Sequence, residues 1–107
     1  MHPPTSALIT YDRLVPLAGA AYIPWRTVGA DLRTEAERLT GGQREMRIAR
    51  ARDCEERAQI QDRLAKARAG NDAAMAARCK AALAGDLAAM RACRDVVELE
   101  QLMGGAL

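Results

Sequence analysis

Large apolar side chains are scarce in this sequence of 107 residues. It contains no phenylalanine, one tryptophan and two tyrosines, against 23 alanines. Each apolar residue therefore buries little surface, and at roughly 25 cal/mol per Å² the gain is small beside an ordering cost of about 1.5 kcal/mol per residue. A monomer of this composition is expected to be only marginally stable. The sequence therefore favours self-association or packing on a partner.

Residues that carry catalysis or bind metals are equally scarce. The single histidine, His2, stands beside two prolines, and the three cysteines, Cys54, Cys79 and Cys93, are too far apart in the sequence to form a C-x-x-C pair. Zinc sites need closely paired ligands, and nucleophilic catalysis usually needs a positioned base. No glycine-rich phosphate-binding motif is present. We therefore predict no catalytic residue, no metal site and no cofactor, and expect the cysteines to act as small buried hydrophobes.

Neither a strong charge nor a long apolar run is present. The net charge is +2, from 16 basic and 14 acidic residues, which does not indicate a dedicated polyanion-binding chain. The longest uncharged stretch, residues 14–25, contains two prolines and is shorter than the roughly 20 residues that span a bilayer. The sequence predicts no transmembrane segment and a location in the cytoplasm or in a particle assembled there. Insertion of residues 14–25 into a membrane surface is a further alternative.

The first 30 residues differ from the rest of the chain. They hold all four prolines and only three charged residues, and proline disfavours a long helix. We expect a mostly non-helical apolar arm over 1–30 that packs on the remaining chain or on another chain. The candidate partner-binding residues of this arm are Leu8, Ile9, Tyr11, Leu14, Leu17, Tyr22, Ile23 and Trp25.

Helical signals begin after the arm. Apolar residues at helical spacing predict a short helix over 31–39, and the two glycines at 41 and 42 then interrupt it. Residues 40–43 have the spacing of a capping box, which predicts a new helix over 41–69. A single helix running through both glycines is the alternative, at a cost of about 1 kcal/mol for each glycine.

The clearest turn lies at residues 70–72. Gly70, Asn71 and Asp72 supply in succession a helix stop, a residue tolerant of left-handed geometry and an N-cap. A third helix is expected over 73–102. The predicted fold is therefore all-α, with an antiparallel helical hairpin in a helical domain over 31–107.

The pattern A-x-A-G-x-x-A-A-M-x-A occurs twice, over residues 67–77 and 82–92. One copy straddles the predicted turn at 70–72. We therefore interpret the match as a coincidence of alanine-rich sequence rather than as a repeat architecture.

Charged residues of the second helix allow two interpretations. We predict that Arg57 pairs with Asp86 across the hairpin and fixes the register of the two helices, the alternative being that both side chains reach solvent. Asp53, four residues before Arg57, is at the spacing of an ion pair within the helix. Basic residues on one side of this helix could instead contact nucleic acid, although interspersed acidic residues weaken that field. The candidate nucleic-acid contacts are Arg47, Arg50, Arg57 and Arg68.

These observations favour an interaction protein over an enzyme. Its arm and helix seams would dock on a protein partner or on copies of the same chain, for example as a subunit of an assembly of the phage or mobile-element type. The alternative is a small nucleic-acid-associated protein that uses its arginine-rich second helix.

Overall fold

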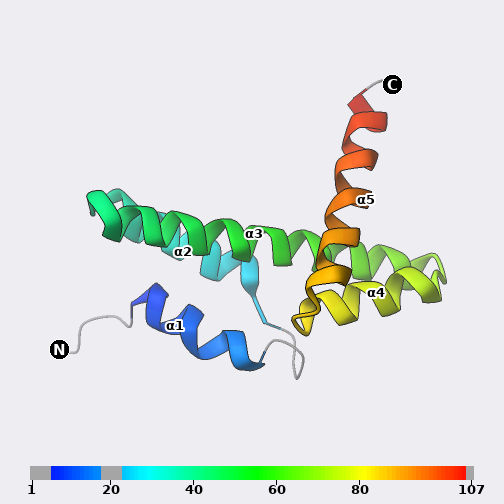
Figure 1. The fold of residues 1–107 in the computed structure, drawn as a ribbon, viewed down its shortest axis with the longest axis horizontal. Coiled ribbons are helices and arrows are strands. Elements are labelled where there is room, and N and C mark those ends of the chain that lie inside the picture. Colours follow the sequence, from blue (N-terminus) through cyan, green and yellow to red (C-terminus); the bar gives the residue numbers. More distant parts are fainter. Residues whose placement is uncertain (1–5, 18–22, 106–107) are drawn as a thin grey trace. The chain divides into compact units, whose positions relative to one another are not determined.

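The computed structural model describes residues 6–17 and 23–105. Over these ranges the fold is all-α, with helices joined by short turns (Figure 1). The elements in chain order are α1 (Ala7–Leu14), the 3-10 turn η1 (Val15–Leu17), α2 (Trp25–Glu37), α3 (Gly41–Ala69), α4 (Ala73–Leu83) and α5 (Leu87–Gly105). The predicted all-α class is confirmed. The chain forms two compact units, unit 1 (Met1–Ala58) and unit 2 (Gln59–Leu107), which divide inside α3.

The predicted non-helical arm is helical over most of its described length. Ser6 caps α1, because its side chain accepts a hydrogen bond from the backbone N–H of Leu8 at 3.2 Å. Pro16 lies in η1, after α1 has ended, and Pro24 directly precedes α2 as its N-cap. Proline is compatible with the first positions of a helix, where its missing N–H would have no partner. The prediction of a mostly non-helical arm is therefore wrong for the described residues.

Helix α2 begins at Trp25 and ends at Glu37, so it starts six residues before the predicted short helix. Its buried residues Trp25, Val28, Leu32 and Ala36 follow one another at intervals of three or four and line one face. This face packs in unit 1 against small side chains of α3. The buried cluster of unit 1 consists of Ala7, Ile23, Trp25, Val28, Leu32, Ala51, Cys54 and Ala58.

A glycine lets α2 lie close to α3. A Cβ atom placed on Gly29 would lie 3.0 Å from the Cβ of Cys54 and 3.4 Å from the carbonyl oxygen of Ala51. The distance to Cys54 is shorter than ordinary van der Waals contact, and the distance to Ala51 is at its lower limit. A side chain at position 29 would therefore push the two helices apart.

The two glycines after α2 separate it from α3. Helix α2 ends at Glu37, and Gly41 has a φ of +61°, a left-handed value that glycine adopts without strain. The prediction of two helices, rather than one helix through Gly41 and Gly42, is confirmed.

In unit 2 the predicted turn at 70–72 is confirmed. Asn71 adopts a φ of +56°, and the carboxylate of Asp72 accepts from the backbone N–H of Met75 at 3.0 Å. Helix α4 then runs back beside the last turns of α3 (Figure 1), which is the antiparallel arrangement expected of the hairpin.

The third predicted helix is divided in two. Helix α4 ends at Leu83, and Gly85 has a φ of +106°, which only glycine adopts readily. Asp86 then begins α5, because its side chain accepts from the backbone N–H of Ala89 at 3.1 Å. A single helix over 73–102 is therefore wrong, since the glycine stop and the aspartate cap end one helix and start the next. The buried cluster of unit 2 consists of Ile60, Ala67, Met75, Cys79, Ala82, Met90 and Cys93.

Candidate interaction surfaces

The arm residues that were expected to bind a partner are divided between the core and the surface of unit 1. Trp25 is 1% exposed and Ile23 is 4% exposed, so both side chains are occupied inside the unit. Leu8, Tyr11 and Leu14 are partly buried against the same cluster.

Two of the remaining arm candidates are exposed on unit 1. Ile9 and Leu17 are about half exposed, at 48% and 53%. Tyr22 falls outside the described residues. The docking role of the arm stays a prediction, and Ile9 and Leu17 are the exposed large apolar side chains in its described part.

A polar network surrounds Trp25 and holds α1 to α3. The hydroxyl of Tyr11 donates to Oδ2 of Asp53 at 2.6 Å, and Nε of Arg57 donates to the same oxygen at 2.9 Å. The guanidinium of Arg57 lies 4.9 Å from the centre of the Trp25 ring, within cation–π distance, and the Tyr11 ring meets the Trp25 ring edge to face at 6.1 Å. Burial, followed by the hydrogen bond to Asp53, raises the pKa of Tyr11. Tyr11 is therefore a structural hydrogen-bond donor.

Arg57 pairs with Asp53, whereas the partner predicted for it across the hairpin was Asp86. Asp53 lies four residues before Arg57 on α3 and forms the observed ion pair. Asp86 instead caps α5 through its bond to the N–H of Ala89. Arg57 thus belongs to the core of unit 1, where it is 9% exposed.

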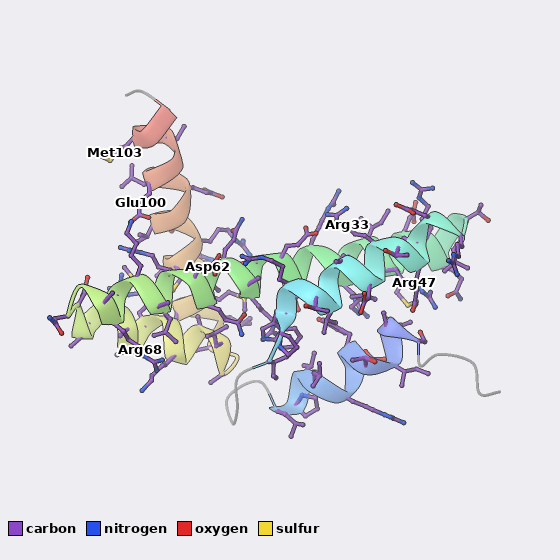
Figure 2. All side chains as sticks on the ribbon, turned by 180° about the vertical axis from the view of Figure 1, so that it is seen from behind. Arg33, Arg47, Asp62, Arg68, Glu100 and Met103 are labelled. Atoms are coloured by element: carbon purple, nitrogen blue, oxygen red, sulfur yellow. The ribbon has the colours of Figure 1, made fainter. Side chains whose placement is uncertain are left out.

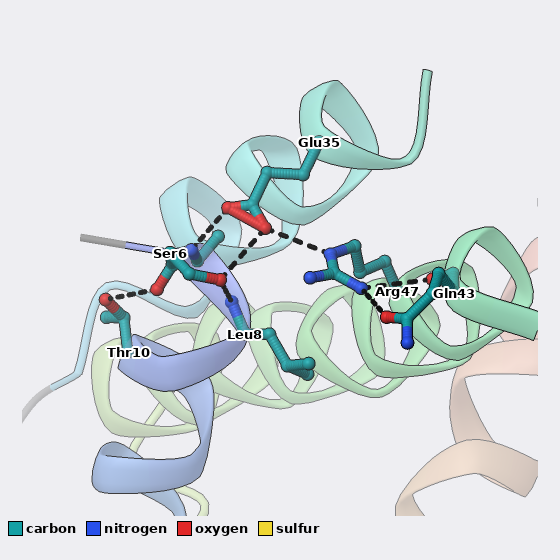
Figure 3. Close-up of polar contacts among 7 residues, drawn as sticks. Ser6, Leu8, Thr10, Glu35, Gln43 and Arg47 are labelled. Carbon is teal, nitrogen blue, oxygen red and sulfur yellow. Dashed lines mark hydrogen bonds and ion pairs between the residues drawn. The ribbon is translucent and has the colours of Figure 1, made fainter. Parts of the chain in front are cut away.

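A second polar node fixes the start of α1 on α2 and α3. Figure 3 shows the carboxylate of Glu35 accepting from the backbone N–H of Ala7, from Oγ of Ser6 at 3.2 Å and from Nε of Arg47 at 3.1 Å. Arg47 also donates to Oε1 of Gln43 at 2.8 Å. Burial alone would raise the pKa of Glu35, but these hydrogen bonds and the charge of Arg47 together lower it.

The candidate nucleic-acid contacts are mostly engaged within unit 1. Arg47 pairs with Glu35, Arg57 pairs with Asp53, and the guanidinium of Arg50 lies 5.8 Å from the centre of the Tyr11 ring. Arg68 is exposed on the part of α3 that belongs to unit 2 (Figure 2). Nucleic-acid binding through these arginines stays a prediction.

Three exposed large apolar side chains lie close together in the C-terminal half of α5, in unit 2. Leu99 is 57% exposed, Leu102 is 73% exposed and Met103 is 61% exposed. We call these three residues the α5 stripe. They are spaced at i, i+3 and i+4, so they share one side of the helix. Leu99 follows the buried Met90 by nine residues, which places it half a turn away, on the opposite side.

Sequence reasoning missed the α5 stripe, although its signal was present. A face defined by Met90 and Cys93 leaves Leu99 and Leu102 on the other side of the same helix. The prediction of one helix over 73–102 did not separate the buried side of α5 from its exposed side, so it did not indicate the stripe.

The α5 stripe lies in an acidic segment. Residues 95–103 contain Asp95, Glu98 and Glu100 and no lysine or arginine. Glu100 pairs with Arg63 at 3.0 Å, whereas Asp95 and Glu98 are exposed. The carboxyl end of a helix also carries a negative partial charge from its dipole. Figure 2 shows Glu100 and Met103 near that end of α5. The surface therefore combines apolar side chains with negative charge.

The three cysteines are free thiols and all are buried. Burial, followed by the charge of Asp53, raises the pKa of Cys54 to about 12, and burial, followed by the neighbouring Cys93, raises the pKa of Cys79 to about 11. Over the described ranges, no three or more His, Cys, Asp or Glu side chains come together to hold a metal ion. Nor does any helix described here have both the length and the apolar character needed to cross a bilayer.

Comparison with known proteins does not place the chain in a family. No family model, no curated protein and no solved structure matches it. Its function must therefore be argued from its own surfaces.

Proposed function

We propose that this chain is a non-enzymatic interaction protein whose α5 stripe binds a basic amphipathic helix of a protein partner. The observation that carries the proposal is the exposure of Leu99, Leu102 and Met103 within an acidic helical segment. Exposed apolar patches rimmed by polar residues are typical of protein interaction sites.

The spacing of the α5 stripe suits a helical partner. An amphipathic helix docks through anchors at i, i+3, i+4 and i+7, and the stripe offers Leu99, Leu102 and Met103 at the first three of these intervals. Val96, three residues before Leu99, is partly buried against the cluster of unit 2 and borders the stripe. A partner helix can therefore lie along the exposed side of α5 while its other side stays packed in unit 2.

Charge selects among the possible helical partners. Asp95 and Glu98 are exposed beside the stripe, so lysine or arginine side chains flanking the apolar face of the partner would be attracted. A second copy that presented its own α5 would bring like charges together, which disfavours pairing of α5 with α5. The proposed partner is therefore a different basic segment and not a second α5.

We place this interaction in the cytoplasm or in a particle assembled there. The support is the cysteine chemistry, because Cys54, Cys79 and Cys93 are all free, and free thiols are characteristic of reducing compartments.

A peptide titration tests the proposed function. The probe is a designed helical peptide with leucine at i, i+3, i+4 and i+7, flanked by lysines and labelled for fluorescence anisotropy. Its matched control has the same leucines with glutamate in place of lysine. We expect saturable binding of the basic peptide that weakens with salt, and at least about tenfold weaker binding of the acidic peptide.

Two pairs of variants locate the surface. Leu99→Gln with Leu102→Gln should weaken binding of the basic peptide by at least about tenfold, because central apolar anchors carry most of the energy of such interfaces. Ile9→Gln with Leu17→Gln changes two exposed apolar residues of the arm and should leave the affinity unchanged. Equal binding of both peptides, a loss caused only by the arm variant, or self-association through α5 would contradict the proposal.

A further inference from the structure

Two cysteine side chains meet inside unit 2. Sγ of Cys79, on α4, lies 3.9 Å from Sγ of Cys93, on α5, and both residues are 0% exposed. Met75 and Met90, each one helical turn before one of these cysteines, belong to the same buried cluster. The core between α4 and α5 therefore gathers two thiols and two thioethers.

We propose that this sulfur cluster binds one Cu(I) ion through the thiolates of Cys79 and Cys93, independently of the α5 stripe. The separation of the two sulfurs fits a shared metal. With metal–sulfur bonds of about 2.3 Å, a linear two-coordinate ion would hold two thiolates about 4.6 Å apart, whereas a trigonal ion with a third ligand holds them about 4.0 Å apart, close to the observed distance. A disulfide bond, at about 2.05 Å, would require the sulfurs to approach by nearly 2 Å.

The ligand set favours a soft monovalent ion. Thiolates and thioethers select Cu(I), whereas zinc takes three or four nitrogen, oxygen or sulfur ligands from the protein. The described residues offer no group of three His, Cys, Asp or Glu side chains to hold such an ion. The thioethers of Met75 and Met90 are the additional soft groups in this cluster, and one of them could complete the coordination of Cu(I).

Arg63 supplies the charge that a buried copper thiolate needs. Binding of Cu(I) displaces one proton from each thiol to water and leaves a centre with one net negative charge. Nε of Arg63 is buried and has no hydrogen-bond partner among the described residues, while Nη2 of the same side chain pairs with Glu100 at 3.0 Å. The positive charges of Arg63 and Arg78 both oppose the rise that burial imposes on the pKa of Cys79. A cation next to the thiolates would stabilise the anionic centre in the core.

The test is an anaerobic titration of the reduced, full-length chain with Cu(I) in competition with a chromogenic Cu(I) chelator. We expect one copper per chain by native mass spectrometry. Because two protons leave, the apparent affinity should rise about 100-fold per pH unit while both thiols are protonated in the free protein. X-ray absorption at the copper edge should show sulfur neighbours only.

Variants assign the ligands. Cys79→Ser and Cys93→Ser should each lower the affinity for Cu(I) by at least about 100-fold, because either change removes half of the thiolate pair. Cys54→Ser changes a thiol that is equally buried but lies in unit 1, and it should bind as the wild type does. Arg63→Gln should weaken binding by about tenfold, the typical effect of removing a group outside the ligand shell. Circular dichroism verifies that each variant is folded.

Three results would overturn the proposal. The first is the absence of stoichiometric copper in the wild-type chain, which needs no variant to interpret. The second is retention of copper by Cys79→Ser. The third is the formation of a Cys79–Cys93 disulfide on mild oxidation, seen as a loss of two hydrogens, in a protein whose reduced form takes up no Cu(I). None of these results bears on peptide binding by the α5 stripe, so the two proposals fail separately.

Discussion

The two units of this chain build their cores from different side chains, although large apolar residues are scarce in both. Unit 1 is built around one aromatic residue, Trp25, with an ion pair and a tyrosine hydroxyl placed against it. Unit 2 has no aromatic residue and buries alanine, methionine, cysteine and isoleucine between helices joined by capped turns. The core of the first unit therefore contains one large aromatic side chain among aliphatic and small ones, whereas the core of the second unit contains only aliphatic and sulfur-containing side chains.

The difference has a consequence for the surface. In unit 1 most described apolar residues of the arm pack in or against the core around Trp25, and Ile9 and Leu17 are the arm's exposed large apolar side chains among the described residues. In unit 2 one side of α5 packs in the core, and the α5 stripe on the other side is exposed. The described part of the arm therefore offers less exposed apolar surface to a partner than α5 does.

The largest expected effect is the loss of Trp25. Trp25→Ala removes a side chain that is 1% exposed, together with its contacts to Arg57 and Tyr11, and should destabilise unit 1 by about 3–5 kcal/mol. Hydrogen exchange measured by mass spectrometry should show faster exchange over Trp25–Glu37 and little change over Ala73–Leu83. The control, Leu87→Ala, alters a side chain that is 77% exposed and should change stability by less than about 0.5 kcal/mol. Equal destabilisation of both helices would break the distinction between the units.

The close packing of α2 on α3 is tested next. Gly29→Ala places a methyl group 3.0 Å from the Cβ of Cys54 and should cost about 1–3 kcal/mol by overpacking. Gly42→Ala is the matched control, because a Cβ there meets nothing within 4 Å, and it should be neutral or stabilising. Urea denaturation measures both. A neutral Gly29→Ala variant would show that α2 and α3 are not held this closely.

Capping should matter in unit 2. Asp72→Ala and Asp86→Ala each remove a carboxylate that accepts from a free N–H at the start of a helix, at a cost of about 1 kcal/mol each. Asp95→Ala, in the interior of α5, should change the free energy of unfolding by less than about 0.5 kcal/mol. If the two cap variants behave like Asp95→Ala in urea denaturation, the turns do not hold unit 2 as described.

The smallest expected effect concerns acid. The pKa of Glu35 is lowered in the folded chain, so its contribution to stability is present above its ordinary value of about 4.3 and is lost as the pH falls through the lower folded value. Glu35→Gln should destabilise unit 1 by less than about 1 kcal/mol at pH 7, since the ion pair with Arg47 is partly exposed.

The same variant should flatten the pH dependence of unit 1. Denaturation measured between pH 7 and pH 3 tests this, with Glu98→Gln in unit 2 as the control. An unchanged acid dependence in Glu35→Gln would show that Glu35 does not fasten α1.

Local signals in the sequence predicted the local features of the fold. Gly70, Asn71 and Asp72 each have a specific backbone or capping role, and the turn was located correctly because those roles do not depend on the rest of the chain. The four-residue spacing of Asp53 and Arg57 likewise indicated the ion pair that they form. The two copies of the alanine-rich pattern each mark a turn between helices, because their glycines, Gly70 and Gly85, lie where one helix ends and the next begins.

Features that depend on tertiary packing were not predicted. The prolines of the arm suggested an irregular segment, yet Pro24 is compatible with the start of α2, and burial of Trp25 stabilises the helix that follows. The composition showed that the arm is rich in apolar residues. It did not show whether their side chains pack on the same chain or on a partner. For the same reason the sequence did not indicate that Cys79 and Cys93 face each other across α4 and α5.

Hydrogen exchange with and without the basic amphipathic peptide tests most directly whether the chain docks through α5 rather than through its arm. We predict that saturating peptide slows exchange over residues 95–103, with no change over Ala7–Leu14 or Trp25–Glu37. Protection gained in the arm, with α5 unaffected, would contradict the assignment of unit 1 to structure and of the α5 stripe to binding.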